Sequence, residues 1–249
     1  DPHDEGDFSS NFVEKVVSKY GPYKYDKSLN ARYNNKNRSF KGNKPQENGA
    51  KYQGEYDDEE DKRHGMGTMV WKDGSRYDGW WRNDQTNGPG RLIMGNGDLY
   101  EGEWVNNRAN GQGKYIHYRG TEYEGEWQND LQHGRGTETW PDGSIYTGQF
   151  RLGRKNGIGK FEWIDGSTFE GDFSNNNMNG KGIYKWSDGR KYEGDWEQGR
   201  MHGDGAFHWE DGRKYEGEYE MDVKSGHGVF YWQDGRQYDG EWRDGKQHG

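Results

Sequence analysis

A repeat of 23 residues dominates this sequence. A ring residue recurs at that interval along most of the chain: Tyr77, Tyr100, Tyr123, Tyr146, Phe169, Tyr192, Tyr215 and Tyr238. The first unit begins at Tyr52 and is two residues longer, because it contains an acidic loop at 57–62. Eight units span 52–237, and a ninth begins at Tyr238. A fixed period of this length indicates stacked units of supersecondary structure, which bury their apolar faces against one another.

The pattern inside each unit predicts a β-hairpin. A unit reads Tyr-acid-Gly-acid-Trp, a polar loop, Gly-x-Gly, and then an aromatic residue followed by Asp-Gly. Alternate side chains share one face of a strand, so Tyr192, Gly194 and Trp196 should lie together, with acids on the other face. Asp211-Gly212 is typical of a turn with positive φ. The Gly-rich segment near His202 and Gly203 is expected to form the second turn.

Glycine content and ring content together define the fold class. Glycine costs about 0.8–1.0 kcal/mol per helical position relative to alanine, so an array with four glycines per unit and no helical period excludes helix. The mean hydropathy of −1.54 is that of a disordered chain, but 12 Trp, 18 Tyr and 9 Phe provide apolar area. We therefore predict an all-β fold. It is an elongated, twisted single-sheet meander of stacked β-hairpins, with a short N-terminal helix and an extended segment before it.

The repeat resembles the MORN repeat. The matching motifs are Tyr-Glu-Gly-Glu-Trp at 100–104 and 123–127, Asn-Gly-x-Gly at 110–113, 156–159 and 179–182, and Asp-Gly at 142–143, 165–166 and 188–189. The resemblance covers about 80% of the chain. It implies β-hairpin arrays of the kind found in scaffolds of cilia, cytoskeleton and membrane junctions. Because nearly the whole chain is repeat, it is most similar to the MORN proteins of ciliary axonemes, such as those of radial spoke heads.

Residues 1–51 form a non-repeat extension ahead of the array at 52–249. Asn11-Phe-Val-Glu14 resembles a capping box, and Gly21-Pro22 would end a helix near 11–20. One side of this helix carries an apolar stripe, which should dock on the exposed first strand of the array or on another protein. The stripe consists of Phe12, Val13, Val16, Val17 and Tyr20.

Charge is distributed unevenly between these two regions. Residues 8–51 contain 10 Lys/Arg and 3 Asp/Glu, whereas 52–249 contain 25 and 37, which gives net charges of +7 and −12. Either the basic extension lies on the acidic array, or it grips an acidic surface such as tubulin or an anionic membrane. The acidic array disfavours nucleic-acid binding, and it leaves the extension as the only region suited to direct membrane contact.

The repeat offers no asymmetric catalytic site, so we predict no enzyme activity, no metal and no cofactor. His64, His133, His202 and His248 recur before glycines, but equivalent positions lie about 10 Å apart, whereas Zn–N bonds measure about 2.0–2.1 Å. These histidines are interpreted as turn residues. Acid pairs such as Glu101/Glu103 also repeat along the array, unlike the two distinct carboxylates of a glycosidase.

A ring-lined face is the predicted protein-binding surface, since aromatic side chains are favoured contacts at interfaces. Its residues are Tyr77, Trp80, Trp81, Tyr100, Trp104, Tyr123, Trp127, Tyr146, Phe150, Trp163, Trp186, Tyr192, Trp196 and Trp209. The second and third units depart most from the pattern, at Trp80, Met94 and His117, through drift or through partner contact. At the other end, Tyr238 and Trp242 would lie on an open strand edge that supports an end-to-end homodimer.

The sequence therefore predicts a non-catalytic structural scaffold that binds other proteins of a multi-subunit assembly. We expect it in the cytoplasm, on the cytoskeleton, in a ciliary or flagellar axoneme. Two alternatives stay open. One is a phospholipid-associated membrane tether. The other is the regulatory MORN part of a larger enzyme, which the stop inside the ninth unit suggests.

Overall fold

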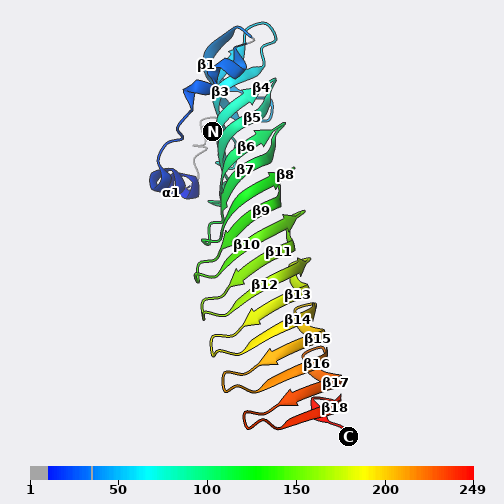
Figure 1. Cartoon of the computed structure of the whole chain (residues 1–249). Coiled ribbons are helices and arrows are strands. Elements are labelled where there is room, and N and C mark those ends of the chain that lie inside the picture. Colours follow the sequence, from blue (N-terminus) through cyan, green and yellow to red (C-terminus); the bar gives the residue numbers. More distant parts are fainter. Residues whose placement is uncertain (1–10, 35) are drawn as a thin grey trace. The chain divides into compact units, whose positions relative to one another are not determined.

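A computed structural model describes residues 11–34 and 36–249, which form an antiparallel array of β-hairpins (Figure 1). The chain divides into an N-terminal unit, Asp1–Leu131, and a C-terminal unit, Gln132–Gly249. The described residues contain one α-helix, one 3₁₀ helix and 19 strands. The predicted all-β meander of stacked hairpins with a short N-terminal helix is confirmed.

In the N-terminal unit, α1 (Asn11–Tyr20) and the 3₁₀ helix η1 (Lys27–Tyr33) precede eight strands. Each strand pairs antiparallel with the next. The strands are β1 (Arg38–Pro45), β2 (Lys51–Asp57), β3 (Arg63–Val70), β4 (Arg76–Arg82), β5 (Gln85–Ile93), β6 (Leu99–Val105), β7 (Arg108–Ile116) and β8 (Glu122–Gln128).

The C-terminal unit continues the same pattern, again with each strand antiparallel to the next. The strands are β9 (Leu131–Thr139), β10 (Ile145–Arg151), β11 (Arg154–Glu162), β12 (Thr168–Ser174), β13 (Asn177–Lys185), β14 (Lys191–Glu197), β15 (Arg200–His208), β16 (Lys214–Glu220), β17 (Val223–Tyr231), β18 (Gln237–Arg243) and β19 (Lys246–Gln247).

Two kinds of turn connect the strands, and one of them lies elsewhere than predicted. The Asp-Gly turns form as expected, with Gly212 at φ +92. The other turns are two residues with positive φ, such as Gln198-Gly199 at +49 and +80, the geometry favoured in tight hairpins. The prediction of a turn near His202 and Gly203 is wrong. Both residues lie inside β15, close to a register shift opposite Trp196.

Ring-on-glycine packing explains the core. The Tyr192 ring lies so close to Gly205 that an added Cβ would stand 2.4 Å from ring carbons. The Tyr192 hydroxyl donates to the carbonyl of Asp195 at 2.9 Å, and Trp196 Nε1 donates to the Gly182 carbonyl at 3.1 Å. The two rings meet edge to face at 5.1 Å. We call the side of the sheet that carries these rings the ring face and the opposite side the acid face.

The acid face has its own structural rule. In five motifs the second acid accepts a hydrogen bond from a backbone N–H of the partner strand, beside the register shift: at Glu55, Glu103, Asp172, Asp195 and Glu218. Asp172 accepts from Lys181 N at 2.9 Å, and Glu103 accepts from Gln112 N at 2.9 Å. The repeated acid therefore gives a backbone donor a charge-assisted hydrogen bond.

The extension covers the first repeat with a strand rather than with the helix. β1 pairs with β2 from Arg38↔Asp57 to Pro45↔Lys51, so it occupies the edge that the first repeat would otherwise expose. The alternative that α1 docks on this first strand is wrong. Val13 of α1 packs instead against Ile93 and Leu99, at the adjoining ends of β5 and β6.

Candidate protein-interaction surfaces

Most of the predicted binding rings are core residues. Eleven of the fourteen are buried, with Tyr77, Trp80, Tyr146 and Tyr192 at 0% exposure, so they cannot contact a partner on this fold. The buried residues are Tyr77, Trp80, Trp81, Tyr100, Trp104, Tyr123, Trp127, Tyr146, Phe150, Tyr192 and Trp196. The predicted ring-lined binding face is corrected on this point. Period-two spacing places the buried rings other than Trp80 on one face, but the glycine rows let those rings pack down onto the backbone.

The remaining three, Trp163, Trp186 and Trp209, are half-buried and belong to a continuous row of rings in the C-terminal unit. Successive ring centroids in this tryptophan row lie 4.4–5.4 Å apart. The row runs Trp140, Phe161, Trp163, Tyr184, Trp186, Phe207, Trp209, Phe230 and Trp232. Each tryptophan precedes an Asp-Gly turn and keeps part of its ring in solvent.

Cations lie against this row. The Arg190 guanidinium lies 5.1 Å from the Trp186 ring and is held by Asp188 at 2.8 Å. Arg213 and Arg236 repeat this arrangement at Trp209 and Trp232. Such contacts contribute about 0.5–1 kcal/mol at exposed sites. The row thus combines flat apolar surface with arginines that aspartates hold in place, and both Trp and Arg are enriched at interfaces.

Two lysines at equivalent repeat positions differ in their partners. Lys155 lies 4.9 Å from the Trp140 ring and pairs with Glu138 at 3.0 Å. Lys224 is surrounded by four rings at 5.2–5.4 Å, and no described carboxylate pairs with it. Burial lowers the pKa of Lys224, with a smaller contribution from Arg213. The four rings are those of Trp209, Tyr215, Phe230 and Trp242.

In the N-terminal unit, the surroundings of Trp80 explain why this residue departs from the repeat. Its ring lies on the acid face, stacked on Tyr33 of the extension at 4.5 Å and edge-on to Tyr25 at 6.4 Å. Tyr33 also donates to the Asn87 carbonyl at 2.7 Å. The acid usual at position 80 would cap the N–H of residue 89, but Pro89 has no N–H. Trp80 is therefore covered by this chain's own extension.

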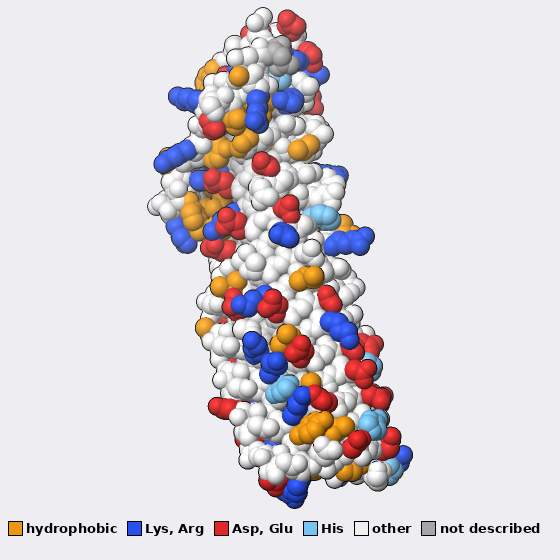
Figure 2. All heavy atoms as spheres, in the orientation of Figure 1, with side chains coloured by type: hydrophobic (Ala, Val, Ile, Leu, Met, Phe, Trp, Pro, Cys, Tyr) orange, Lys and Arg blue, Asp and Glu red, His pale blue; other side chains and the backbone are white. Residues whose placement is uncertain are grey.

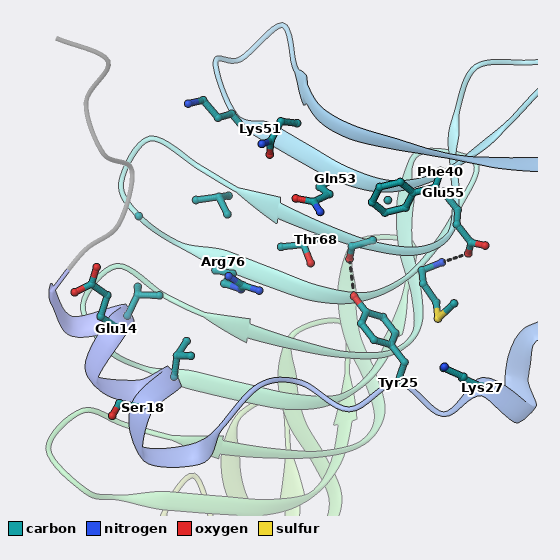
Figure 3. A pocket seen from close by; sticks show the side chains of 18 residues that line it. Glu14, Ser18, Tyr25, Lys27, Phe40, Lys51, Gln53, Glu55, Thr68 and Arg76 are labelled. Atoms are coloured by element: carbon teal, nitrogen blue, oxygen red, sulfur yellow. Dashed lines mark hydrogen bonds between the residues drawn. The ribbon is translucent and has the colours of Figure 1, made fainter.

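A groove lies on the acid face beside α1 and β1, with a volume of about 1150 Å³. Figure 3 shows its floor strands between β1, which carries Phe40, and the segment that carries Tyr25 and Lys27. Gln53 and Thr68 lie on the floor. We call this feature the N-terminal groove.

Ion pairs join one part of the extension to the first repeat. Lys41 and Lys44 both pair with Asp61, at 2.5 and 2.8 Å, and their hydrogen bonds lower the pKa of Asp61 to about 2. Lys36 bridges Asp57 and Glu60 at 2.5 and 2.9 Å. The expectation that the basic extension lies on the acidic array thus describes residues 36–44.

The predicted dimer edge is partly covered. β18 pairs with β19 only at Trp242↔Gln247 and Arg243↔Lys246, and His248 N donates to the Glu241 carbonyl at 2.8 Å. Trp242 is buried, and Tyr238 is half-buried with its hydroxyl on the Glu241 carbonyl. The homodimer remains a prediction.

The predicted apolar stripe of α1 is only partly used. Val13, Val16 and Val17 pack with Ile93, Leu99 and Ile116, whereas Phe12 and Tyr20 are exposed. Within the described residues, neither helix has the length and apolar character needed to cross a bilayer.

Three of the four repeated histidines are strand residues rather than the predicted turn residues, and His248 follows the end of β19. His64, His133 and His202 lie in β3, β9 and β15. His64 is 1% exposed and lies 5.9 Å from the Tyr33 ring. Over 11–34 and 36–249, no group of three His, Asp or Glu side chains is arranged to hold a metal ion.

Sequence reasoning missed the tryptophan row as a separate feature, although a signal was present. A Trp precedes the turn in each unit from Trp140 to Trp232 but not at Met94 or His117. The net charges of the extension and the array were a weaker guide to the interaction surfaces. Figure 2 shows acidic and basic side chains interspersed on the visible face rather than in one field of either sign.

Hairpin units that bury rings on glycine and stack in sequence define a β-hairpin repeat protein. The MORN repeat family model matches nine segments of the chain, so the chain belongs to the MORN-repeat family. The matched segments are 52–76, 77–99, 100–122, 123–145, 146–168, 169–189, 192–212, 215–235 and 238–249. No curated protein matches the chain.

Solved structures show weaker likenesses. The SAS-4 (dCPAP) TCP domain of Drosophila melanogaster, solved with a proline-rich motif of Ana2, is 14% identical; the match covers 72% of this chain and 85% of that one, with a TM-score of 0.35. The E1021V mutant of the TCP10 domain of Danio rerio CPAP is 10% identical; the match covers 79% and 97%, with a TM-score of 0.41. Both TM-scores are below 0.5, so neither likeness supports an inference about this chain.

Proposed function

We propose that this chain is a non-catalytic structural scaffold that binds other proteins through the tryptophan row. MORN repeats are protein- or membrane-interaction modules. The observation that carries the proposal is the row of nine touching rings, whose tryptophans are half-buried rather than enclosed. Hot spots of interfaces are enriched in Trp and Arg, and here both are held on regular hairpins.

The proposed setting is the cytoplasmic cytoskeleton, in a ciliary or flagellar axoneme, as one subunit of a multi-protein assembly. The support is architectural. Repeats fill the chain from 52 onward, and their equivalent sites recur without an asymmetric cluster of reactive side chains. A periodic row of contacts suits a partner that is itself extended or repetitive.

Proximity labelling in ciliated cells tests this proposal. The wild-type chain is expected to label axonemal or other cytoskeletal proteins, and a Trp163→Ser/Trp186→Ser variant is expected to lose them. The matched control is Ile183→Ser/Val229→Ser, which alters two half-buried apolar residues in strands of the same unit. Circular dichroism checks that both variants stay folded. Equal labelling by both variants would remove the row from the mechanism, and an absence of cytoskeletal proteins would remove the setting.

Phospholipid tethering is the second candidate, favoured by exposed cations on the extension. Lys15, Lys19 and Lys24 are exposed and form no ion pair with any described carboxylate. Basic residues near an anionic leaflet contribute about 1 kcal/mol each. Flotation with phosphatidylserine liposomes, using the full chain and a chain without residues 1–51, separates the two candidates. Tethering requires flotation that is lost with the extension.

A further inference from the structure

The N-terminal groove differs from the acid face elsewhere in the array. The first acid of the motif is replaced by Gln53, and the floor strands present Met66, Thr68 and Val70. The one floor carboxylate, Glu55, is engaged by Arg38 at 3.0 Å and by Met66 N at 2.6 Å. The floor therefore combines apolar Met66 and Val70 with polar Gln53 and Thr68, and its Arg76 is paired with Asp78 at 2.6 Å. Repeats such as those at 101–103 and 193–195 carry two acids at the corresponding positions.

An exposed ring stands at the border of the groove. Phe40 on β1 is 65% exposed, although it is a large apolar side chain in a paired strand. Tyr25 lies on the opposite side, with its hydroxyl donating to the Gly67 carbonyl at 3.2 Å. An exposed ring beside a concave, partly apolar floor is the arrangement that receives side chains of a partner segment.

The charge around the groove is unbalanced. The extension has ten cations, and the four in 36–44 pair with acids of β2 and its loop. The exposed cations of 15–32 have no such partner among the described carboxylates. Two acids accompany them in 14–32: Glu14, which lines the groove, and Asp26, which caps Ser28. These unpaired cations are Lys15, Lys19, Lys24, Lys27 and Arg32. The α1–η1 side of the groove thus carries a surplus of positive charge.

From this charge complementarity we propose that the N-terminal groove is a docking site for an acidic protein segment with apolar side chains. Its volume of about 1150 Å³ exceeds the 300–1000 Å³ typical of small-molecule pockets, which suits a peptide segment. A planar membrane would meet the exposed cations but could not reach the recessed floor. The site rests on the proposed role in protein interaction, yet it is separate in residues from the tryptophan row.

Selection from a displayed library of random peptides tests the site on the full chain. Wild-type protein is the bait, and a Lys24→Glu/Lys27→Glu/Phe40→Ser variant is used for counter-selection. All three side chains are exposed, so the variant is expected to stay folded. We expect enrichment of peptides that combine Asp or Glu with aromatic or aliphatic residues. Their affinity should fall at least tenfold on the variant, and salt should weaken their binding.

The control is Lys185→Glu/Ile158→Ser, which makes the same kinds of change at exposed positions of the C-terminal unit. It should bind the selected peptides as the wild type does. Enriched peptides without acids, equal binding to the groove variant, or no enrichment over that variant would each overturn the proposal. Binding of phosphatidylserine vesicles that the groove variant abolishes, without acidic peptides being enriched, would assign the cations to a membrane instead. Trp163→Ser/Trp186→Ser separates the two surfaces, because it should lose cellular partners while keeping the selected peptides.

Discussion

The N-terminal and C-terminal units use the same hairpin in different ways. In the N-terminal unit, the extension covers the acid face through α1 and through Tyr33, which stacks on Trp80. Met94 and His117 interrupt the row of turn tryptophans there. In the C-terminal unit, the tryptophan row is continuous. The repeat therefore fixes the backbone and the buried rings, while the residues beside them decide which surface is available.

Trp80 tests the first half of this comparison most strongly. Trp80→Glu restores the residue type usual at this position but removes a fully buried ring and its stack on Tyr33. It should cost about 4 kcal/mol of unfolding free energy, measured by urea denaturation. Adding Pro89→Gln restores an N–H for the new acid and should recover about 1 kcal/mol. If Trp80→Glu alone were as stable as the wild type, the packing of the extension would not depend on this ring.

The two lysines of the C-terminal unit give the next largest effect. Lys155→Met leaves Glu138, whose side chain is 18% exposed, without its ion-pair partner. It should cost about 3 kcal/mol of unfolding free energy. Lys224→Met leaves no described acid without an ion-pair partner, and it introduces the residue found at the equivalent positions 178 and 201. It should change stability by less than about 1 kcal/mol. Equal losses in urea denaturation would contradict the assigned difference in partners.

The acid that caps the backbone should matter more than its neighbour on the same strand. Asp172→Ala removes the acceptor for Lys181 N and should cost about 1 kcal/mol. Glu170→Ala, two residues earlier and exposed, should be close to neutral in the same denaturation assay. If Glu170→Ala cost as much, the repeated acids would act through net charge and not through the cap.

The smallest effect concerns pH. Burial, with help from Lys36 and Arg38, lowers the pKa of His64 below its ordinary 6.5. The neutral ring is thus favoured in the folded state, so its contribution to stability is complete above about pH 6.5 and is lost as pH falls below that value. His64→Phe should reduce the loss in urea midpoint between about pH 7.5 and 5.5. An unchanged pH dependence in the His64→Phe variant would assign the loss to other groups, such as His208, whose pKa burial also lowers.

Hairpins and a helix at 11–20 could be predicted because both follow local periodicity. β1 could not, since Arg38–Pro45 lacks a clear alternation and owes its structure to pairing with β2. The sequence pattern also could not predict which rings are exposed to solvent. Period two assigns Tyr192 and Trp196 to a face, but their burial depends on how far the rings fold onto glycine.

The candidate site was predictable in type but not in position. Trp163, Trp186 and Trp209 were singled out together with eleven core rings, because one motif contains both kinds. Only the spatial contacts separate them. Trp80 and Pro89 could have been paired from sequence, since both depart from the repeat nine positions apart, but the reason requires knowing which N–H the acid caps.

Five buried tryptophans donate to a glycine carbonyl 14 residues earlier, and this bond has a consequence for dynamics. Trp104 donates to Gly90 and Trp196 donates to Gly182, so each of these hairpins is bonded to its immediate predecessor. Coupling of this nearest-neighbour kind lets an array fray from a free end without melting elsewhere. Amide exchange should then be graded along each unit, fastest in terminal hairpins, and a partner that bridges several hairpins would flatten that gradient.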